Sequence, residues 1–122
     1  MTNVGIVLIS HSAKVVEGIY DIITQMVPNV KVELAGGTDD GEIGTSVEKI
    51  LQAIDRTHHE KGVLLFYDIG SALMNAELAV EMTEHENVAI AEAPLLEGAF
   101  VAAVESGMGK TLEEVKEAAE SV

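Results

Sequence analysis

The chain has 122 residues, enough for one domain with its own core and too few for two, so we expect residues 1–122 to form a single domain. Hydrophobic residues make up 48% of the sequence and aromatic residues only 3%, so the predicted core is aliphatic. The formal net charge of −14 argues against a nucleic-acid ligand and against an anionic membrane surface. It favours a basic protein partner, or simply good solubility.

Several further features narrow the class of protein. The sequence has no cysteine, which excludes disulfides and thiolate–metal sites. No apolar run approaches the roughly 20 residues that cross a bilayer. The first residues, MTNVGIVLIS, lack the basic segment of a signal peptide. These features predict a cytoplasmic protein without a membrane segment.

The first part of the chain alternates between strand and helix patterns. Residues 4–9 form a continuous apolar run, which predicts a strand buried on both faces. Ser12 is a good N-cap for a helix that Pro28 ends. Residues 30–34 alternate apolar and polar, which predicts a half-exposed strand at the edge of the sheet. The inward face of the first helix is predicted from apolar residues at helical spacing: Val15, Ile19, Ile22 or Ile23, and Met26.

A glycine-rich segment, residues 36–44, precedes the second predicted helix. Thr45 and Glu48 have the spacing of a capping box, and apolar residues recur at helical spacing from Val47 to Ile54. The remaining predicted elements are a strand over 63–67, a helix from about 72 to 83, a strand over 88–91, a helix opened by Pro94 and closed by Gly107, and a short helix that begins at a capping box of Thr111 and Glu114.

The predicted order of elements is β-α-β-α-β-α-β-α-α. Strands that alternate with helices predict an α/β fold, a doubly wound sandwich whose central parallel sheet has helices on both faces. Right-handed crossovers leave few topologies. Because the second strand is typical of an edge and the first and third of the centre, we expect the strand order 2-1-3-4.

The candidate site follows from this topology. Ligands of such sheets bind at the carboxyl ends of the strands, where the winding reverses. In the order 2-1-3-4 the reversal lies between the first and third strands, so His11 and Asp68, which follow those strands, should face each other. A carboxylate that accepts a hydrogen bond from Nδ1–H of a histidine leaves Nε2 as an unprotonated nucleophile.

Three predicted helix N-termini surround this pair, near Ser12, Thr45 and Ser71. Helix N-termini bind anions through free backbone N–H groups and the helix dipole. Lys14 is the only basic residue close by in sequence. The site is therefore predicted to hold a phosphoryl group by amides and hydroxyls rather than by a cationic clamp.

Each of these features also has a purely structural interpretation. His11 could be a capping or loop residue, Asp68 the N-cap of the third helix, and residues 36–44 a flexible turn, since their spacing matches no known phosphate loop. Two other classes of protein remain open. One is a response-regulator receiver, which has the same strand order but needs an acidic pair after its first strand; the other is a binding module that forms no covalent species.

Four ordered motifs cover nearly the whole chain: GIVLISHS, GGTDDGEIGTS, YDIGSA with MN just after it, and APLLEGAF. Together they resemble the mannose-type EIIA family of the phosphotransferase system, and most closely its members that serve PTS-dependent dihydroxyacetone kinases. The resemblance implies that His11 is phosphorylated and that Asp68 orients it. It also implies that two loops line the pocket, one with Gly37, Thr38, Gly44, Thr45 and Ser46, the other with Gly70 and Ser71.

The resemblance further implies a homodimer that takes a phosphoryl group from HPr and passes it to ADP bound on the DhaL subunit. The nucleotide then phosphorylates dihydroxyacetone held by DhaK. No metal or cofactor is expected on this chain, with ADP/ATP and Mg²⁺ on the DhaL partner. The alternative within the family is an EIIA domain that passes phosphate to a sugar-transporting IIB domain. The apolar, alanine-rich helix of residues 95–104 is the candidate dimer contact, although a core helix explains it equally well.

Overall fold

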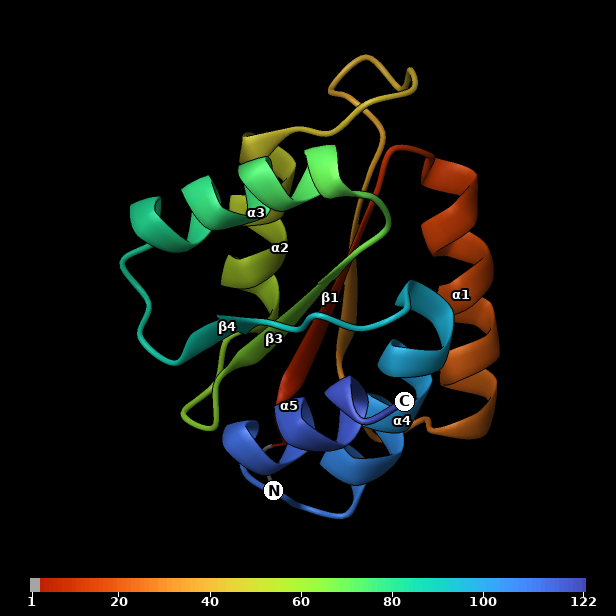
Figure 1. The fold of residues 1–122 in the computed structure, drawn as a ribbon, viewed down its shortest axis with the longest axis vertical. Coiled ribbons are helices and arrows are strands. Elements are labelled where there is room, and N and C mark those ends of the chain that lie inside the picture. Colours follow the sequence, from red (N-terminus) through yellow and green to blue (C-terminus); the bar gives the residue numbers. More distant parts are fainter. Residues whose placement is uncertain (1–2) are drawn as a thin grey trace.

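The computed structural model describes residues 3–122, which form an α/β fold with helices packed around a parallel sheet (Figure 1). The sheet order is β2-β1-β3-β4 and all neighbouring strands are parallel, so the predicted order 2-1-3-4 is confirmed. The elements in chain order are β1 (Gly5–Ser10), α1 (Ala13–Met26), β2 (Val32–Gly36), α2 (Val47–Thr57), β3 (Val63–Tyr67), α3 (Gly70–Met82), β4 (Val88–Ile90), α4 (Leu95–Gly107) and α5 (Leu112–Glu120).

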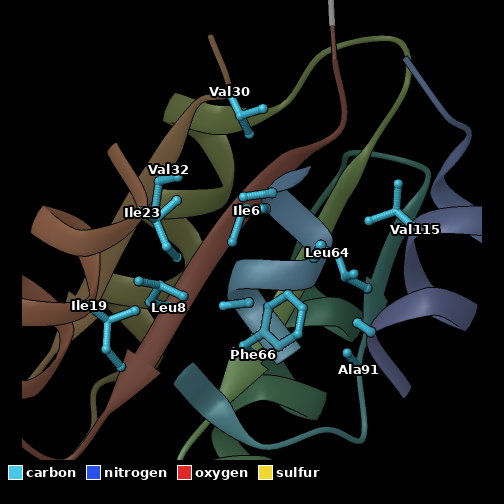
Figure 2. Packing of buried hydrophobic residues seen from close by; sticks show 14 of the residues in the cluster. Ile6, Leu8, Ile19, Ile23, Val30, Val32, Leu64, Phe66, Ala91 and Val115 are labelled. Atoms are coloured by element: carbon cyan, nitrogen blue, oxygen red, sulfur yellow. The ribbon is translucent and has the colours of Figure 1, made fainter. Parts of the chain in front are cut away.

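The sheet separates two aliphatic clusters, because successive side chains of a strand point to opposite faces. On one face Ile6, Leu8 and Phe66 pack against α1, α4 and α5 (Figure 2). On the other face Val7 and Leu65 pack against α2 and α3. All five side chains are fully buried. The prediction of helices on both faces of the sheet is therefore confirmed, and the buried core is aliphatic apart from Phe66.

The inward face of α1 differs from the predicted face. Val16, Ile19 and Ile23 are buried, whereas Val15 and Met26 are 44% and 65% exposed, so the prediction that these last two face the core is wrong. Apolar residues occupy more of the surface of this helix than the sheet can bury. Their helical spacing is compatible with two neighbouring rows of side chains along the helix. The contact with the sheet selects the line that is buried.

Gly36, the last residue of β2, allows α1 to approach the sheet closely. A Cβ atom at this position would lie 2.5 Å from Val16 Cγ2 and 2.8 Å from Ala13 Cα. Such separations are too short for carbon atoms in contact. The absence of a side chain at Gly36 therefore lets the first turn of α1 lie beside the carboxyl end of the sheet.

The predicted boundaries shift most in β2 and α3, and by one residue in β1 and β4. β2 covers residues 32–36 rather than 30–34, because its pairing with β1 begins where Ile6 lies opposite Val32. Its predicted place at the sheet edge is confirmed. α3 begins at Gly70, two residues earlier than predicted, so Ser71 belongs to its first turn. The capping box predicted for the start of α5 is confirmed.

We expect Gly36→Ala to lower the free energy of unfolding by about 1–3 kcal/mol, because the added methyl group overpacks the contact between β2 and α1. Gly18→Ala is the matched control. Nothing lies within 4 Å of a Cβ at Gly18, and alanine is favoured over glycine inside a helix by about 0.5–1 kcal/mol, so this variant should be more stable. Denaturant titration of both variants measures the difference. Equal effects would contradict the close contact at Gly36.

Candidate active site

The carboxyl ends of β1 and β3 bring His11 and Asp68 together, although 57 positions separate them in the sequence. The two strands are parallel neighbours with Ile9 opposite Tyr67, so the residues that follow them leave the sheet at the same edge. His11 Nδ1 lies 3.1 Å from Asp68 Oδ1 and 3.3 Å from Oδ2. The pair stands at the switch point of the sheet, where ligands of this architecture bind.

The contact with Asp68 determines which ring nitrogen of His11 carries the proton. An ionised carboxylate only accepts hydrogen bonds, so Nδ1 carries the hydrogen and donates it to Asp68. In the neutral ring Nε2 then has a free lone pair, and the Ser71 hydroxyl, 2.8 Å away, donates to it. The His11 side chain is 22% exposed, so it lies near the surface. Because its Nε2 carries a lone pair and no proton, this nitrogen can act as a nucleophile.

Asp68 also accepts hydrogen bonds from the backbone around it. Its Oδ2 accepts from the N–H of His11 and from the hydroxyl of Ser10, both at 2.9 Å, and its Oδ1 accepts from the N–H of Ile69 at 2.7 Å. Burial alone raises the pKa of Asp68, but these hydrogen bonds and that of the His11 ring hold the pKa below the usual value of an aspartate. Asp68 therefore stays ionised and keeps accepting from the histidine.

Ser10 belongs to this site, although it is not among the predicted site residues. The residue is 1% exposed, its hydroxyl donates to Asp68, and its Oγ accepts from the N–H of Ser12 at 3.0 Å. The available signal was a hydroxyl at the end of an aliphatic buried strand, since a buried hydroxyl requires a partner. Ser12 occupies the predicted N-cap position of α1, but its side chain makes no capping hydrogen bond.

The glycine-rich segment is tied to the end of β1 by its backbone. The N–H of Gly37 donates to the Ser10 carbonyl at 3.0 Å, and the N–H of Gly44 donates to the His11 carbonyl at 2.9 Å. The N–H of Thr38 is bonded within the loop itself. Both glycines have positive φ, at 73° and 142°, which favours glycine. The structure thus ties Gly37 and Gly44 to the backbone of Ser10 and His11, and the amides of Gly37, Thr38 and Gly44 are already engaged in holding the loop.

The capping box predicted at Thr45 and Glu48 is wrong. Ser46 is the N-cap of α2, and its Oγ accepts from the N–H of Lys49 at 3.2 Å. Thr45 Oγ1 instead accepts from Nδ2 of Asn75 at 2.6 Å, which links the glycine-rich loop to α3. Both hydroxyl residues suit a cap, so spacing alone could not choose between them. Asn75, which belongs to the MN motif but is not among the predicted site residues, bonds Thr45 from α3, while Ser46 caps α2.

Gly70 and Ser71 begin α3 with Ile69 as the N-cap, so Asp68 does not cap this helix. Within residues 3–122 the N–H groups of Gly70 and Ser71 donate to no acceptor, as is usual in a first helical turn. The Ser71 hydroxyl contacts Nε2 of His11 at the same place. Free amides and a hydroxyl next to a nucleophile are the donors that can surround phosphoryl oxygens.

Within residues 3–122, no helix combines the length and the apolarity that crossing a membrane requires. The same part of the chain brings together no group of three His, Asp or Glu side chains that could hold a metal ion.

Comparison with known proteins shows the class to which this fold and site belong. The family model described as EIIA-man, PTS system fructose IIA component, matches residues 5–116. The chain therefore belongs to the EIIA-man family of the phosphotransferase system. This membership argues against the response-regulator interpretation of the strand order.

Within that family the chain is similar to DhaM subunits. The chain is 45% identical over 104 residues to the phosphoryl donor subunit DhaM of PEP-dependent dihydroxyacetone kinase 1 from Listeria innocua, covering 85% of this chain and 82% of that protein. It is 38% identical over 118 residues to the DhaM subunit of the PTS-dependent dihydroxyacetone kinase from Lactococcus lactis, covering 97% and 94%. A crystal structure of a protein of unknown function matches with a TM-score of 0.88 and 32% identity, covering 99% of this chain and 95% of that one.

The hydrogen bonds to Asp68 predict a pH dependence of stability. Because its pKa is lower in the folded chain, its stabilising contribution is fully present above the usual carboxyl pKa and is lost as the pH falls through the lowered value. Below about pH 4 we therefore expect the unfolding free energy of the wild type to fall more steeply than that of Asp68→Asn. Denaturant titrations at a series of pH values measure both slopes. Asp21→Asn, at an exposed position of α1, is the control that should keep the wild-type slope, and identical slopes for all three chains would contradict the prediction.

Proposed function

We propose that this chain is the phosphoryl donor subunit of a PEP-dependent dihydroxyacetone kinase and that His11 Nε2 carries the phosphoryl group. The observation that carries this proposal is the arrangement of His11 between Asp68 and Ser71. Nδ1 donates to a carboxylate, and the Nε2 lone pair lies beside free helix amides. The DhaM relatives favour the kinase over the sugar-transporting alternative.

In the first half of the reaction, His11 takes the phosphoryl group from the phosphohistidine of HPr. Nε2 attacks the phosphorus in line, and the bond from phosphorus to the donor nitrogen breaks as the new N–P bond forms. The donor ring keeps the electron pair of the broken bond. Positive charge then develops on the His11 ring, and the carboxylate of Asp68, 3.1 Å from Nδ1, stabilises it.

Ser71 changes partner during this step. Its hydroxyl occupies the Nε2 lone pair in the resting site, so it turns away when the phosphorus approaches. The hydroxyl and the first amides of α3 then donate to the phosphoryl oxygens. These donors are neutral, so they hold the group more weakly than charged partners would, which suits a group that leaves again.

In the second half, phosphorylated His11 gives the group to the terminal phosphate oxygen of ADP on the DhaL subunit. The N–P bond breaks, Nε2 keeps its electron pair, and the ATP formed phosphorylates dihydroxyacetone on DhaK. We place ADP, ATP and Mg²⁺ on DhaL and no cofactor on this chain.

We further propose a cytoplasmic homodimer. α4 is mainly a core helix, because Ala99, Ala102 and Ala103 are buried. Its outer side forms, with α1, an apolar surface that includes Ile22 and Phe100, and we assign this surface to the second copy. A sedimentation mass equal to one chain would contradict the dimer.

We expect His11→Ala to accept no phosphoryl group. With phosphoenolpyruvate, Enzyme I and HPr, the wild-type chain should gain the mass of one phosphoryl group, labile in acid and stable in alkali. His85→Ala is the control. This histidine precedes β4, near the amino end of that strand, and its Nε2 contacts Asp55 rather than Asp68. Loading of His11→Ala at the wild-type rate would disprove the assignment of the nucleophile.

We expect Asn75→Ala to slow the loading of His11 about twofold to tenfold. Loss of one neutral hydrogen bond costs about 0.5–1.5 kcal/mol, and this bond joins the glycine-rich loop to α3 across the site. Asn29→Ala is the matched control, because its Nδ2 donates to the Gly107 carbonyl away from His11. Quenched samples analysed by intact mass give both rates. Equal rates in the two variants would show that the link has no part in loading.

A further inference from the structure

Ser10 is a polar residue at the end of a fully buried strand. Every residue of β1 is buried, and Ser10 itself is 1% exposed. Its hydroxyl bonds Asp68 on the Nδ1 side of the His11 ring, whereas the nucleophilic Nε2 is on the other side of the ring. A buried hydroxyl in this place cannot meet a partner protein, so any influence it has on the reaction passes through its neighbours.

The two hydrogen bonds of the Ser10 side chain have a fixed direction. Its Oγ accepts from the N–H of Ser12 at 3.0 Å, and its O–H donates to Oδ2 of Asp68 at 2.9 Å. An amide N–H can only donate and an ionised carboxylate can only accept, so the hydroxyl proton points to Asp68. This hydroxyl therefore connects the start of α1, where Ser12 is the N-cap residue, to the carboxylate.

The Ser10 hydroxyl limits the rotation of the Asp68 carboxylate. The last torsion of an aspartate side chain is broad, so a free carboxylate turns readily. Here Oδ2 accepts from the hydroxyl of Ser10 and the N–H of His11, and Oδ1 accepts from the N–H of Ile69. Within residues 3–122, Ser10 is the one side chain besides His11 that bonds this carboxylate. The hydroxyl thus helps to hold the orientation that places Oδ1 3.1 Å from Nδ1 of His11.

We infer that Ser10 is a positioning residue for phosphoryl transfer, an inference that rests on the proposed function. Its hydroxyl holds the carboxylate of Asp68 in the orientation that keeps the ring proton of His11 on Nδ1. Without the hydroxyl the carboxylate turns more freely, and the neutral ring carries its proton on Nε2 in a larger share of the molecules. A protonated Nε2 has no free lone pair, so those molecules cannot attack phosphorus.

A buried serine can also have a purely structural role, since a hydroxyl out of contact with water requires a partner. Ser106 is the control that separates the two roles. It is also fully buried, and its hydroxyl donates to the carbonyl of Val4, next to the amino end of β1. Ser10→Ala and Ser106→Ala each remove one buried hydrogen bond, so both should lower the denaturant concentration at half-unfolding. Only Ser10→Ala should affect His11.

The first test measures the loading of His11 by phosphorylated HPr, with samples quenched and analysed by intact mass. Ser10→Ala should lower the maximal loading rate about threefold to tenfold, which corresponds to the loss of one hydrogen bond. The KM for HPr should not change, because a buried hydroxyl does not bind the donor. Ser10→Thr keeps the hydroxyl and should load faster than Ser10→Ala, and Ser106→Ala should load at the wild-type rate.

The second test determines whether Ser10 acts through Asp68. A chain with Asp68→Ala has no carboxylate for the hydroxyl to hold, so adding Ser10→Ala to it should not slow the loading any further. Such non-additivity of two substitutions is the signature of residues that act as one unit.

The third test observes the ring of His11 directly and needs no partner protein. The NMR chemical shifts of its two nitrogens distinguish a protonated ring nitrogen from an unprotonated one. At a pH at which the ring is neutral, the Nε2 signal should move toward that of a protonated nitrogen in Ser10→Ala. In Ser106→Ala it should stay at the wild-type position.

The positioning role is contradicted if Ser10→Ala loads as fast as Ser106→Ala, if it slows loading equally with and without the Asp68 carboxylate, or if the Nε2 signal does not move. Should Ser10→Ala fail to fold, Ser10→Cys takes its place, because a thiol is a weaker donor of similar size. A wild-type chain that HPr does not load would instead remove the proposed function, and the Nε2 signal would still show whether Ser10 positions the ring.

Discussion

The carboxylate of Asp68 is the interaction on which the site depends. It accepts hydrogen bonds from the ends of two strands, through the Ser10 hydroxyl, the His11 amide and the Ile69 amide, and it also accepts from the His11 ring. These donors keep the carboxylate ionised against the effect of its burial. The same contacts fix the tautomer of the ring, so the state of the nucleophile follows from the way the strands end.

Small residues bring the helices close enough to the sheet to build this site. Gly36 admits the first turn of α1, and the buried alanines of α3 let that helix lie against the strands. An inner face of alanines needs little space, so the larger apolar residues of α3 remain outside. The packing that delivers Ser71 to His11 therefore also leaves an apolar surface beside the nucleophile.

Much of this architecture could be predicted from the sequence. The strands that became β1 and β3 are almost wholly apolar, which is typical of central parallel strands, and the alternating run before the glycine-rich segment is typical of an edge. Those patterns predict the strand order 2-1-3-4, because right-handed crossovers between parallel strands leave few alternative topologies. Since neighbouring parallel strands have their carboxyl ends at the same end of the sheet, this topology predicts that His11 and Asp68 lie together.

The sequence by itself thus determined the order of the elements, the aliphatic core and the edge of the sheet where the polar residues gather. Only the tertiary structure decided which apolar line of α1 is buried, that Ser46 rather than Thr45 caps α2, and that Ser10 supports Asp68. The physical reason is the same in each case. Periodicity and capping are local properties with several near-equal solutions, and contacts between distant segments, such as Asn75 with Thr45, select one of them.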